Sequence, residues 1–346
     1  MRAITQRSLG GPSVLESVEL ERPEPTVTEV LVRVHAASVN PVDTYVRAGM
    51  MPLLGQPPFV LGWDVSGVVE AVTPGVNRFR VGDEVYGMPA FPRAAGAYAE
   101  YVTAPARQLS RKPAGLSHAE AAALPLAGLT AWQGLVDGAG LQAGQRVLVH
   151  GAGGGVGHLA VQIAKARGAE VYATAGADKH DFLPELGADH LIDHRTADFT
   201  AGLTDLDVVL DPIGGDVADR SLTVLREGGA LVTLVQSSDR EFAERVAAAG
   251  LRFVPTVVEP DHVGLEALTE LVEAGLLRPH VEQELPLAEA AKAHELIEGR
   301  RTKGKIVLRN CATSRQLRQG DGRSRSSPRP QELALRGGGS AVRMGT

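Results

Sequence analysis

The sequence predicts an α/β protein with two parts: a β-rich domain and a domain built on a doubly wound parallel sheet. About the first 115 residues form short runs of alternating apolar and polar positions separated by Gly and Pro, which is typical of half-buried strands and turns. From about residue 120, short apolar runs alternate with amphipathic segments, which predicts parallel strands joined by right-handed helical crossovers. A glycine-rich turn between one such run and the next helix supports the same fold.

Individual strands are predicted from these runs. In the β-rich part they span residues 29–36, 64–70, 82–86 and 97–102. In the second part they span residues 146–150, 170–174, 190–193, 208–211, 230–234 and 252–254. The helix after the first of these has one apolar face, made by Val156, Leu159, Ala160, Ile163 and Ala164.

The remaining segments are a late folded region and a tail. Residues 262–309 are predicted as a helix, a short strand, a second helix at 287–298 and a final strand at 305–308. This region could rejoin the β-rich domain, but the sequence alone does not show it. Residues 311–346 are rich in Arg, Ser, Gly and Pro without periodicity, which predicts a disordered tail. A shifted reading frame would produce the same kind of composition.

The composition is that of an ordinary globular protein. The chain has 346 residues, 44% of them apolar and 22% charged, and this length favours two domains. It has no uncharged apolar run of about 18 residues, so no membrane span is expected. The first residues lack the apolar core of a secretory signal, so we expect a cytoplasmic protein. The single cysteine, Cys311, excludes an internal disulfide and a cysteine-rich metal cluster.

Charge is distributed unevenly along the chain. The net charge is −6, but the tail carries seven Arg and two acidic residues, or +5, so the rest of the chain carries −11. An acidic body argues against general nucleic-acid binding.

The turn at residues 151–157, Gly-Ala-Gly-Gly-Gly-Val-Gly, is the segment most informative about function. Its pattern is AxGxxG, in which a small first residue fits the tight turn, Gly154 lets a pyrophosphate approach the backbone and Gly157 lets helix and strand pack closely. Free N–H groups at the helix start would bind the phosphates. The alternative is a glycine-rich surface loop. We predict that a dinucleotide contacts Gly151, Ala152, Gly154, Gly155, Val156 and Gly157.

The next predicted strand indicates which nicotinamide cofactor is used. NAD sites usually carry an Asp or Glu at the end of this strand, where it binds the ribose 2′-hydroxyl. Here the strand ends at Thr174, the small Gly176 follows, and Lys179 comes soon after. A missing acid and a nearby cation suit a 2′-phosphate, so the sequence predicts NADPH. Asp178 argues against this, and Lys179 could instead be a solvated helix residue.

Further motifs support a family resemblance. Five segments occur in order around the turn: 36–45 (AASVNPVDTY), 61–67 (LGWDVSG), 82–87 (GDEVYG), 124–131 (LPLAGLTA) and 302–308 (TKGKIVL). Together they resemble the zinc-free quinone oxidoreductase (zeta-crystallin-like) branch of the medium-chain dehydrogenase/reductase superfamily. The resemblance covers roughly residues 1–310. It implies a GroES-like catalytic domain at 1–120 and 260–310, a Rossmann NADPH-binding domain at 121–259, and a homodimer or homotetramer.

The resemblance also argues against a metal. Zinc-dependent relatives carry a Cys at the position of Asn40 and a His-Glu pair at the position of Trp63 and Asp64, together with a four-cysteine lobe, and this chain has none of these. Zinc needs three or four thiolate, imidazole or carboxylate ligands, which Asp64 alone does not supply. No metal is therefore expected.

Site residues are carried over from the family position by position. Asn40, Tyr45 and Thr130 resemble residues that line the nicotinamide and substrate pocket. Gly176 and Lys179 match the 2′-phosphate site. His194 stands where many relatives have a Tyr, so a ring could still pack beside the adenosine. Arg300 resembles an arginine that reaches the 2′-phosphate, a role that Arg301 could take instead.

These residues predict a reaction class. Without a metal Lewis acid, exchange between carbonyl and alcohol is disfavoured, whereas hydride addition to a quinone or an α,β-unsaturated carbonyl needs only a hydrogen-bond donor at the distant oxygen. Tyr45 is the candidate donor, although it could merely wall the pocket. Asn40 could donate its amide or simply occupy the turn before Pro41. Thr130 is expected to position the nicotinamide ribose.

Two alternative functions remain open. An enoyl reductase acting on thioester-linked 2-enoates would use the same hydride addition. A member of a different class would be an RNA-binding protein, which would use the Arg-rich tail, or a structural crystallin-like protein, which would need only the fold. The acidic body disfavours RNA binding.

Overall fold

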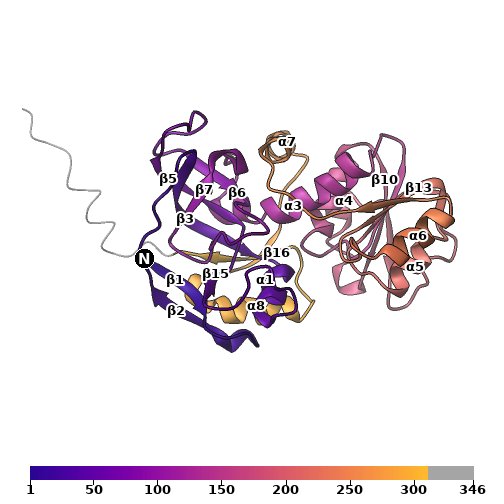
Figure 1. The fold of residues 1–346 in the computed structure, drawn as a ribbon. Helices are drawn as coiled ribbons and strands as arrows, with labels where there is room; N and C mark the ends of the chain where they lie inside the picture. Colours follow the sequence, from indigo (N-terminus) through magenta and orange to yellow (C-terminus); the bar gives the residue numbers. More distant parts are fainter. Residues whose placement is uncertain (311–346) are drawn as a thin grey trace, which may run out of the picture. The chain divides into compact units, whose positions relative to one another are not determined.

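The computed structural model describes residues 1–310. The tail predicted to be disordered, residues 311–346, lies outside the described residues. The described chain contains one small sheet and two larger ones (Figure 1). The small sheet is antiparallel and has the order β2 (Leu15–Glu19), β1 (Arg2–Gln6), β4 (Phe59–Val60).

The seven-stranded sheet combines both ends of the described chain. Its order is β15–β16–β3–β5–β6–β8, and β7 pairs with the first half of β3. The final strand pairs antiparallel with β3, Ile306 opposite Val39, so the late segment does rejoin the β-rich part. The strands are β3 (Glu29–Val39), β5 (Val65–Val72), β6 (Glu84–Gly87), β7 (Tyr101–Pro105), β8 (Leu109–Arg111), β15 (Val281–Pro286) and β16 (Lys305–Arg309).

The six-stranded sheet is parallel throughout and has the order β11–β10–β9–β12–β13–β14. The strand order reverses at β9, so chain segments leave the centre of the sheet in opposite directions, which is the arrangement of a doubly wound fold. The predicted fold class is therefore confirmed. The strands are β9 (Arg146–Val149), β10 (Glu170–Ala175), β11 (His190–Asp193), β12 (Leu206–Asp211), β13 (Leu225–Thr233) and β14 (Arg252–Pro255).

Helix α1 begins and ends where local chemistry predicts. Helix α1 starts after Asn40, with Pro41 in its first turn and Asp43 completing a capping box, and ends at Gly49 with φ of 79°. A Cβ is strained at that φ, so glycine suits the position. The helices are α1 (Pro41–Ala48), α2 (His118–Ala122), α3 (Pro125–Trp132), α4 (Gly157–Ala166), α5 (Asp216–Ser221), α6 (Arg240–Ala248), α7 (His262–Glu273) and α8 (Ala290–Glu298).

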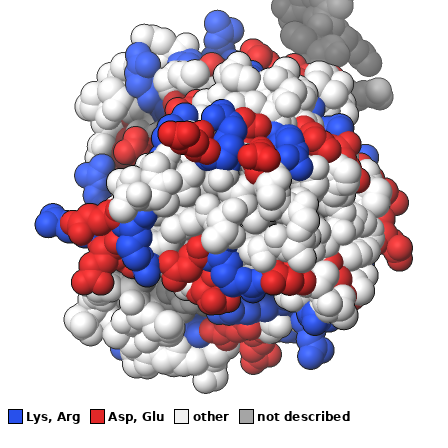
Figure 2. Space-filling view, turned by 90° about the vertical axis from the view of Figure 1, so that its right-hand side faces the viewer, with Lys and Arg blue, Asp and Glu red and all other residues white. Residues whose placement is uncertain are grey.

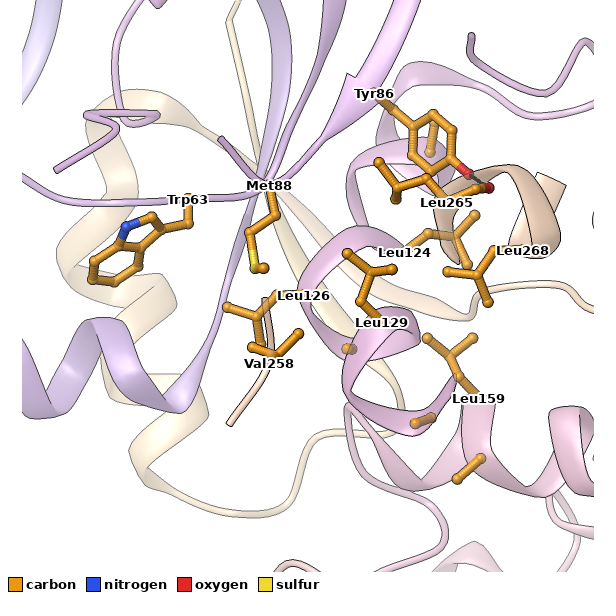
Figure 3. Packing of buried hydrophobic residues seen from close by; sticks show 14 of the residues in the cluster. Trp63, Tyr86, Met88, Leu124, Leu126, Leu129, Leu159, Val258, Leu265 and Leu268 are labelled. Atoms are coloured by element: carbon orange, nitrogen blue, oxygen red, sulfur yellow. Dashed lines mark hydrogen bonds between the residues drawn. The ribbon is translucent and has the colours of Figure 1, made fainter. Parts of the chain in front are cut away.

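One cluster of buried apolar side chains includes members of both larger sheets. Helix α3 lies at its centre (Figure 3): Leu126 is near Met88 of the β-rich part, and Leu129 is near Leu265 of α7 and Leu159 of α4. Because α3 carries the predicted site residue Thr130, apolar packing on several sides holds that residue in place.

One predicted strand is displaced. Residues 97–102 were expected as a strand, but β7 begins only at Tyr101. The preceding residues bind a different part of the chain: Ala97 and Tyr98 donate their backbone N–H groups to Gly62 and Leu61, and Ile4 donates to the Tyr98 carbonyl. Alternation alone does not distinguish these pairings. Within residues 1–310, no helix is both long and apolar enough to cross a membrane.

Candidate functional site

The glycine turn lies between β9 and α4, as predicted. Gly151 has φ of 59°, and a Cβ at Gly157 would lie 2.3 Å from the Gly151 carbonyl oxygen and 2.7 Å from the Ala152 Cα. Gly157 is thus required for the close helix–strand approach. Ala152 is buried and donates its N–H to the Thr174 carbonyl at 3.0 Å. In the first turn of α4, the N–H groups of His158, Leu159 and Ala160 already donate to the carbonyls of Gly154 and Val156, at 2.9–3.1 Å. An anion would therefore meet the N–H groups at the start of the helix, those of Gly155, Val156 and Gly157.

A buried histidine that the sequence analysis missed holds this turn. His158 Nδ1 lies 2.9 Å from the Gly154 carbonyl oxygen, and the His280 N–H donates to His158 Nε2 at 3.2 Å. The second bond makes Nε2 an acceptor, so Nδ1 carries the proton and donates to Gly154. Burial lowers the pKa of His158 to about 3, which keeps the ring neutral.

Two further contacts connect the turn region with late segments of the chain. Gln162 exchanges hydrogen bonds with the backbone of Arg278, at 3.0 Å and 2.9 Å. Gly304 donates its N–H to the Gly153 carbonyl at 3.1 Å. The turn is therefore held between α4 and the segments just before β15 and β16. A signal for these contacts is hard to find in sequence, because they pair backbone groups far apart in the chain.

The end of β10 places the predicted cofactor residues in different environments. The Thr174 hydroxyl lies 3.0 Å from His150 Nδ1, while His150 Nε2 lies 3.0 Å from the Ser221 hydroxyl. Ser221 donates to the Val217 carbonyl at 2.6 Å, so it accepts from His150, and His150 in turn accepts from Thr174. The Thr174 hydroxyl proton is thus directed into the protein. Its backbone carbonyl, bonded to Ala152, supports the turn.

Lys179 lies against the turn. Its Nζ donates to the Thr302 carbonyl at 2.6 Å and lies 3.4 Å from the Gly153 carbonyl oxygen. Burial lowers the pKa of Lys179, partly offset by Asp178 and Glu282. In this structure, the ammonium therefore connects the turn to the segment before β16.

A second cation stands at Gly176. A Cβ there would lie 2.5 Å from Asp178 Oδ1 and 3.1 Å from the Arg195 guanidinium carbon. Arg195 pairs with Asp178 at 3.4 Å, so the acid that argued against NADPH has a compensating charge. Arg195 was not among the predicted residues, although it directly follows the predicted and exposed His194. Arg300 is also exposed, with φ of 54°.

Asn40 belongs to a buried polar cluster that we call the Lys305 cluster, made of Asn40, Asp64 and Lys305. Lys305 Nζ donates to Asn40 Oδ1 at 2.5 Å and lies 3.6 Å from Asp64 Oδ2, while Asn40 Nδ2 donates to Asp64 Oδ2 at 2.8 Å. The three side chains are at most 2% exposed. Burial lowers the pKa of Lys305, and Asp64 and Asp43 oppose that effect.

Asp64 and Asp43 connect this cluster to its surroundings. Asp64 accepts from the Ser38 hydroxyl at 2.6 Å and from the Leu126 N–H, at the start of α3, at 2.7 Å. Asp43 accepts from the Asn40 N–H at 2.8 Å. Burial raises the pKa of Asp43 to about 7, and the Asp64 charge adds to this rise.

The other two predicted catalytic residues lie on the helices that begin at these contacts. Tyr45 is half-buried on α1. Thr130 is buried on α3 and donates its hydroxyl to the Leu126 carbonyl at 2.6 Å, which leaves the oxygen free to accept. The structure therefore links the starts of the helices that carry Tyr45 and Thr130 through one cluster that also contains Asn40.

Comparisons with known proteins agree with this architecture. Residues 26–114 match the family model described as an alcohol dehydrogenase GroES-like domain, and residues 186–308 match one described as a zinc-binding dehydrogenase. The human quinone oxidoreductase is 32% identical over 89% of this chain and 97% of its own length. The chain belongs to the medium-chain dehydrogenase/reductase superfamily. A mycocerosic acid synthase-like polyketide synthase of Mycobacterium tuberculosis is 37% identical over 87% of this chain, but the chain spans only 15% of that protein's length.

Solved structures place the chain in the same superfamily. The Escherichia coli quinone oxidoreductase complexed with NADPH is 31% identical, with a TM-score of 0.81 over 90% of this chain and 100% of its own. A protein described as an NAD-dependent alcohol dehydrogenase is 39% identical, with a TM-score of 0.82 over the same shares. The CurK enoyl reductase is 29% identical, with a TM-score of 0.82 over 89% of this chain and 98% of its own. The chain is an oxidoreductase of the quinone oxidoreductase branch.

The residues present do not fit the metal named in one family description. Among residues 1–310, no three or more His, Cys, Asp or Glu side chains are grouped so that they could hold a metal ion. Asn40 and Asp64 instead face the Lys305 ammonium, and Trp63 is buried with its indole N–H donated to the Arg93 carbonyl at 2.7 Å. A cationic ammonium repels a second cation.

Proposed function

We propose that this oxidoreductase transfers hydride from NADPH to a quinone or an α,β-unsaturated carbonyl without zinc. The proposal rests on the charges near the glycine turn, at the end of β10. The acid there, Asp178, is paired with Arg195, and a second cation, Lys179, lies nearby. The NADPH complex of the E. coli relative supports the same cofactor. The Lys305 cluster supports a reaction without a metal, because it offers no set of zinc ligands.

The chain's own residues have four tasks in this reaction. The turn at 151–157 holds the pyrophosphate on backbone N–H groups, and Arg195, with Lys179 close by, supplies positive charge for the 2′-phosphate. Bound NADPH supplies the hydride. Tyr45 donates a hydrogen bond to the substrate oxygen on which negative charge develops, and a proton from solvent completes the reduction. The Thr130 hydroxyl oxygen accepts from the nicotinamide ribose.

A second substrate class is supported by two relatives. The CurK enoyl reductase and the M. tuberculosis synthase both match most of this chain. A thioester-linked 2-enoate presents the same activated double bond, so the same residues would serve. Parallel assays with 1,4-benzoquinone, 2-cyclohexenone and crotonyl thioesters, followed by NADPH absorbance, separate the classes. Absence of turnover with all three would overturn the proposed function.

Cofactor choice is tested by direct binding. We expect NADPH to bind at least about tenfold more tightly than NADH, since a charge-assisted contact to the 2′-phosphate contributes about 1.5–3 kcal/mol. Arg195→Ala should narrow the ratio by weakening NADPH alone. Lys179→Ala should weaken NADPH more than NADH, because this ammonium also holds the turn that binds the pyrophosphate of both cofactors. Arg167→Ala, on the far end of α4, serves as the control. Equal affinities in the parent protein would show that the NADPH assignment is wrong.

Metal independence needs a measurement of its own. We expect full activity in excess chelator, and stoichiometric zinc found by elemental analysis would contradict the proposal.

Partners are tested separately. We also propose a homodimer or homotetramer, which light scattering tests. Nucleic acid is not an expected partner: on the face shown in Figure 2, acidic and basic side chains alternate without a continuous basic patch. A salt-sensitive RNA shift would support the RNA-binding alternative.

A further inference from the structure

Lys305 reaches from β16 to groups on three other elements. Its Cδ would lie 3.4 Å from a Cβ built on Gly155, so its stem runs beside the glycine turn. Its Nζ donates to Asn40 Oδ1, the N-cap residue of α1, and faces Asp64, which accepts from the Leu126 N–H in the first turn of α3. One side chain therefore lies beside the cofactor turn, contacts the N-cap of α1 directly and reaches the start of α3 through Asp64.

The bonds within the cluster allow only one orientation of the Asn40 amide. An ammonium can only donate and a carboxylate can only accept. Oδ1 of Asn40 must therefore face Lys305, and Nδ2 must face Asp64 Oδ2. Because the amide is planar and its orientation is fixed, the second hydrogen on Nδ2 also points in one fixed direction. Removing the ammonium would leave Oδ1 without its charged donor and release this constraint.

We propose that Lys305 is a positioning residue for the reduction: its ammonium orients the Asn40 amide and holds the starts of α1 and α3 beside the glycine turn. This inference rests on the proposed function. It assigns Lys305 no contact with substrate. The Lys305 ammonium supplies the positive charge of this cluster, and the residues of the cluster do not form a set of metal ligands. The orientation of Asn40 and Asp64 therefore depends on the Lys305 side chain rather than on a bound metal ion.

The principal test is Lys305→Met, which keeps most of the apolar stem beside Gly155 and removes the charge. We expect kcat to fall at least about tenfold, since small misplacements of catalytic groups have effects of about 10²-fold. The Kd for NADPH should change less than about threefold, because the turn itself is intact. Lys292→Met is the matched control, since Lys292 is exposed on α8 and pairs with Glu289; its kcat should be that of the parent.

A double-mutant cycle tests whether Lys305 acts through Asn40. If it does, Asn40→Ala combined with Lys305→Met should lower kcat no further than the more damaging single variant. Multiplicative losses in the double variant would show that the two residues act independently and would overturn the proposal. Small-amine rescue adds a readout that a purely structural role would not produce: ethylammonium, but not choline, should restore part of kcat in Lys305→Ala.

Folding failure must be separated from a positioning defect. Lys305→Met leaves the buried Asp64 without its cation, which is destabilising. The variant Asp64→Asn/Lys305→Met removes both charges and avoids that cost. A neutral double variant that is folded and retains parental kcat would overturn the proposal, as would a fully active Lys305→Met. An inactive parent protein across the substrate panel would instead overturn the proposed function itself.

Discussion

Asp43 is a residue whose charge state depends on the fold. Its carboxyl is buried, accepts a hydrogen bond from the Asn40 N–H, and has a second oxygen, Oδ1, without a well-aligned donor. Tyr98 lies close enough to lower the pKa of Asp43, but burial and Asp64 dominate and raise it to about 7. The Tyr98 hydroxyl also lies 3.2 Å from His294 Nε2, whose ring is held by Arg47.

Replacing Asp43 with Asn should change how stability depends on pH. The folded pKa of Asp43 is above its unfolded value of 3.8, so between pH 4 and 7 the folded state holds a proton that the unfolded state has released. Parental stability should therefore fall with rising pH relative to Asp43→Asn, by up to about 1.4 kcal/mol per pH unit. Urea unfolding from pH 4.5 to 7.5 measures this, with the exposed Asp216→Asn as control. A pH-independent difference would contradict it.

Two glycines of the turn should respond differently to Ala. At Gly157 the new Cβ meets backbone atoms at 2.3 Å and 2.7 Å, whereas at Gly155 the nearest atom is 3.4 Å away, on the flexible Lys305 stem. We expect Gly157→Ala to lower the free energy of unfolding by about 1–3 kcal/mol. Gly155→Ala should unfold like the parent and weaken NADPH binding alone. Calorimetry with and without NADPH distinguishes the two, and equal destabilisation would contradict this division of roles.

At the scale of elements, helix α4 does more than present its first turn to a phosphate. His158 and Gln162, one turn apart on α4, bind the backbone at His280 and Arg278, and His158 also supports Gly154. The helix therefore connects the cofactor turn to the segment that leads into β15. Motion of that segment would be transmitted directly to the turn.

Loss of the His158 contact should loosen the turn more than loss of the Gln162 contact. His158→Ala leaves the His280 N–H unpaired, removes one of the two donors to the Gly154 carbonyl and opens a cavity, at a cost of about 2–4 kcal/mol in stability. Hydrogen exchange at residues 152–157 should become faster. Gln162→Ala is the matched control, because it removes the Arg278 contacts and a bond to the His158 carbonyl but no bond to the turn, so exchange in the turn should be nearly unchanged. Identical exchange in both variants would rule out a specific role for His158.

The sequence predicted elements better than it predicted contacts. The turn, the strands of the parallel sheet and the final strand Lys305–Arg309 have local signals: periodicity, glycine spacing and an apolar run. Lys305 was part of a quoted motif, yet its partners Asn40 and Asp64 lie more than 240 positions away. The bond of His158 to His280 spans 122 positions. Such pairings depend on how the sheets pack, and one sequence contains no local trace of them.

At the scale of the whole molecule, three buried histidines make folding sensitive to acid. They lie in different regions: His150 after β9, His158 on α4 and His294 on α8. Burial is the first cause in each, lowering the pKa to about 4 for His150 and to about 3 for His158 and His294. Each ring accepts a hydrogen bond that its protonated form would lose.

Stability should therefore decrease as the pH falls below about 6.5, the unfolded pKa of histidine. Between there and pH 4 the unfolded chain binds up to three protons that these folded rings do not. His118, whose pKa burial also lowers to about 4, adds a fourth, while the raised pKa of Asp43 works in the opposite direction by one. Near pH 5.5 the balance is between about two and three protons taken up on unfolding, or about 2–4 kcal/mol lost per pH unit. Urea unfolding at pH 7.0, 6.0 and 5.5 measures this slope.

A single substitution can test the origin of this slope. His150→Gln can still accept from Thr174 and donate to Ser221, but it does not titrate. It should reduce proton uptake on unfolding by about one, whereas Asp43→Asn should increase it by about one, because the variants remove opposing contributions. The exposed His194→Gln is the control. If the slope is the same in all four proteins, the acid sensitivity does not arise from these buried groups, and the hydrogen-bond directions assigned to His150 would need revision.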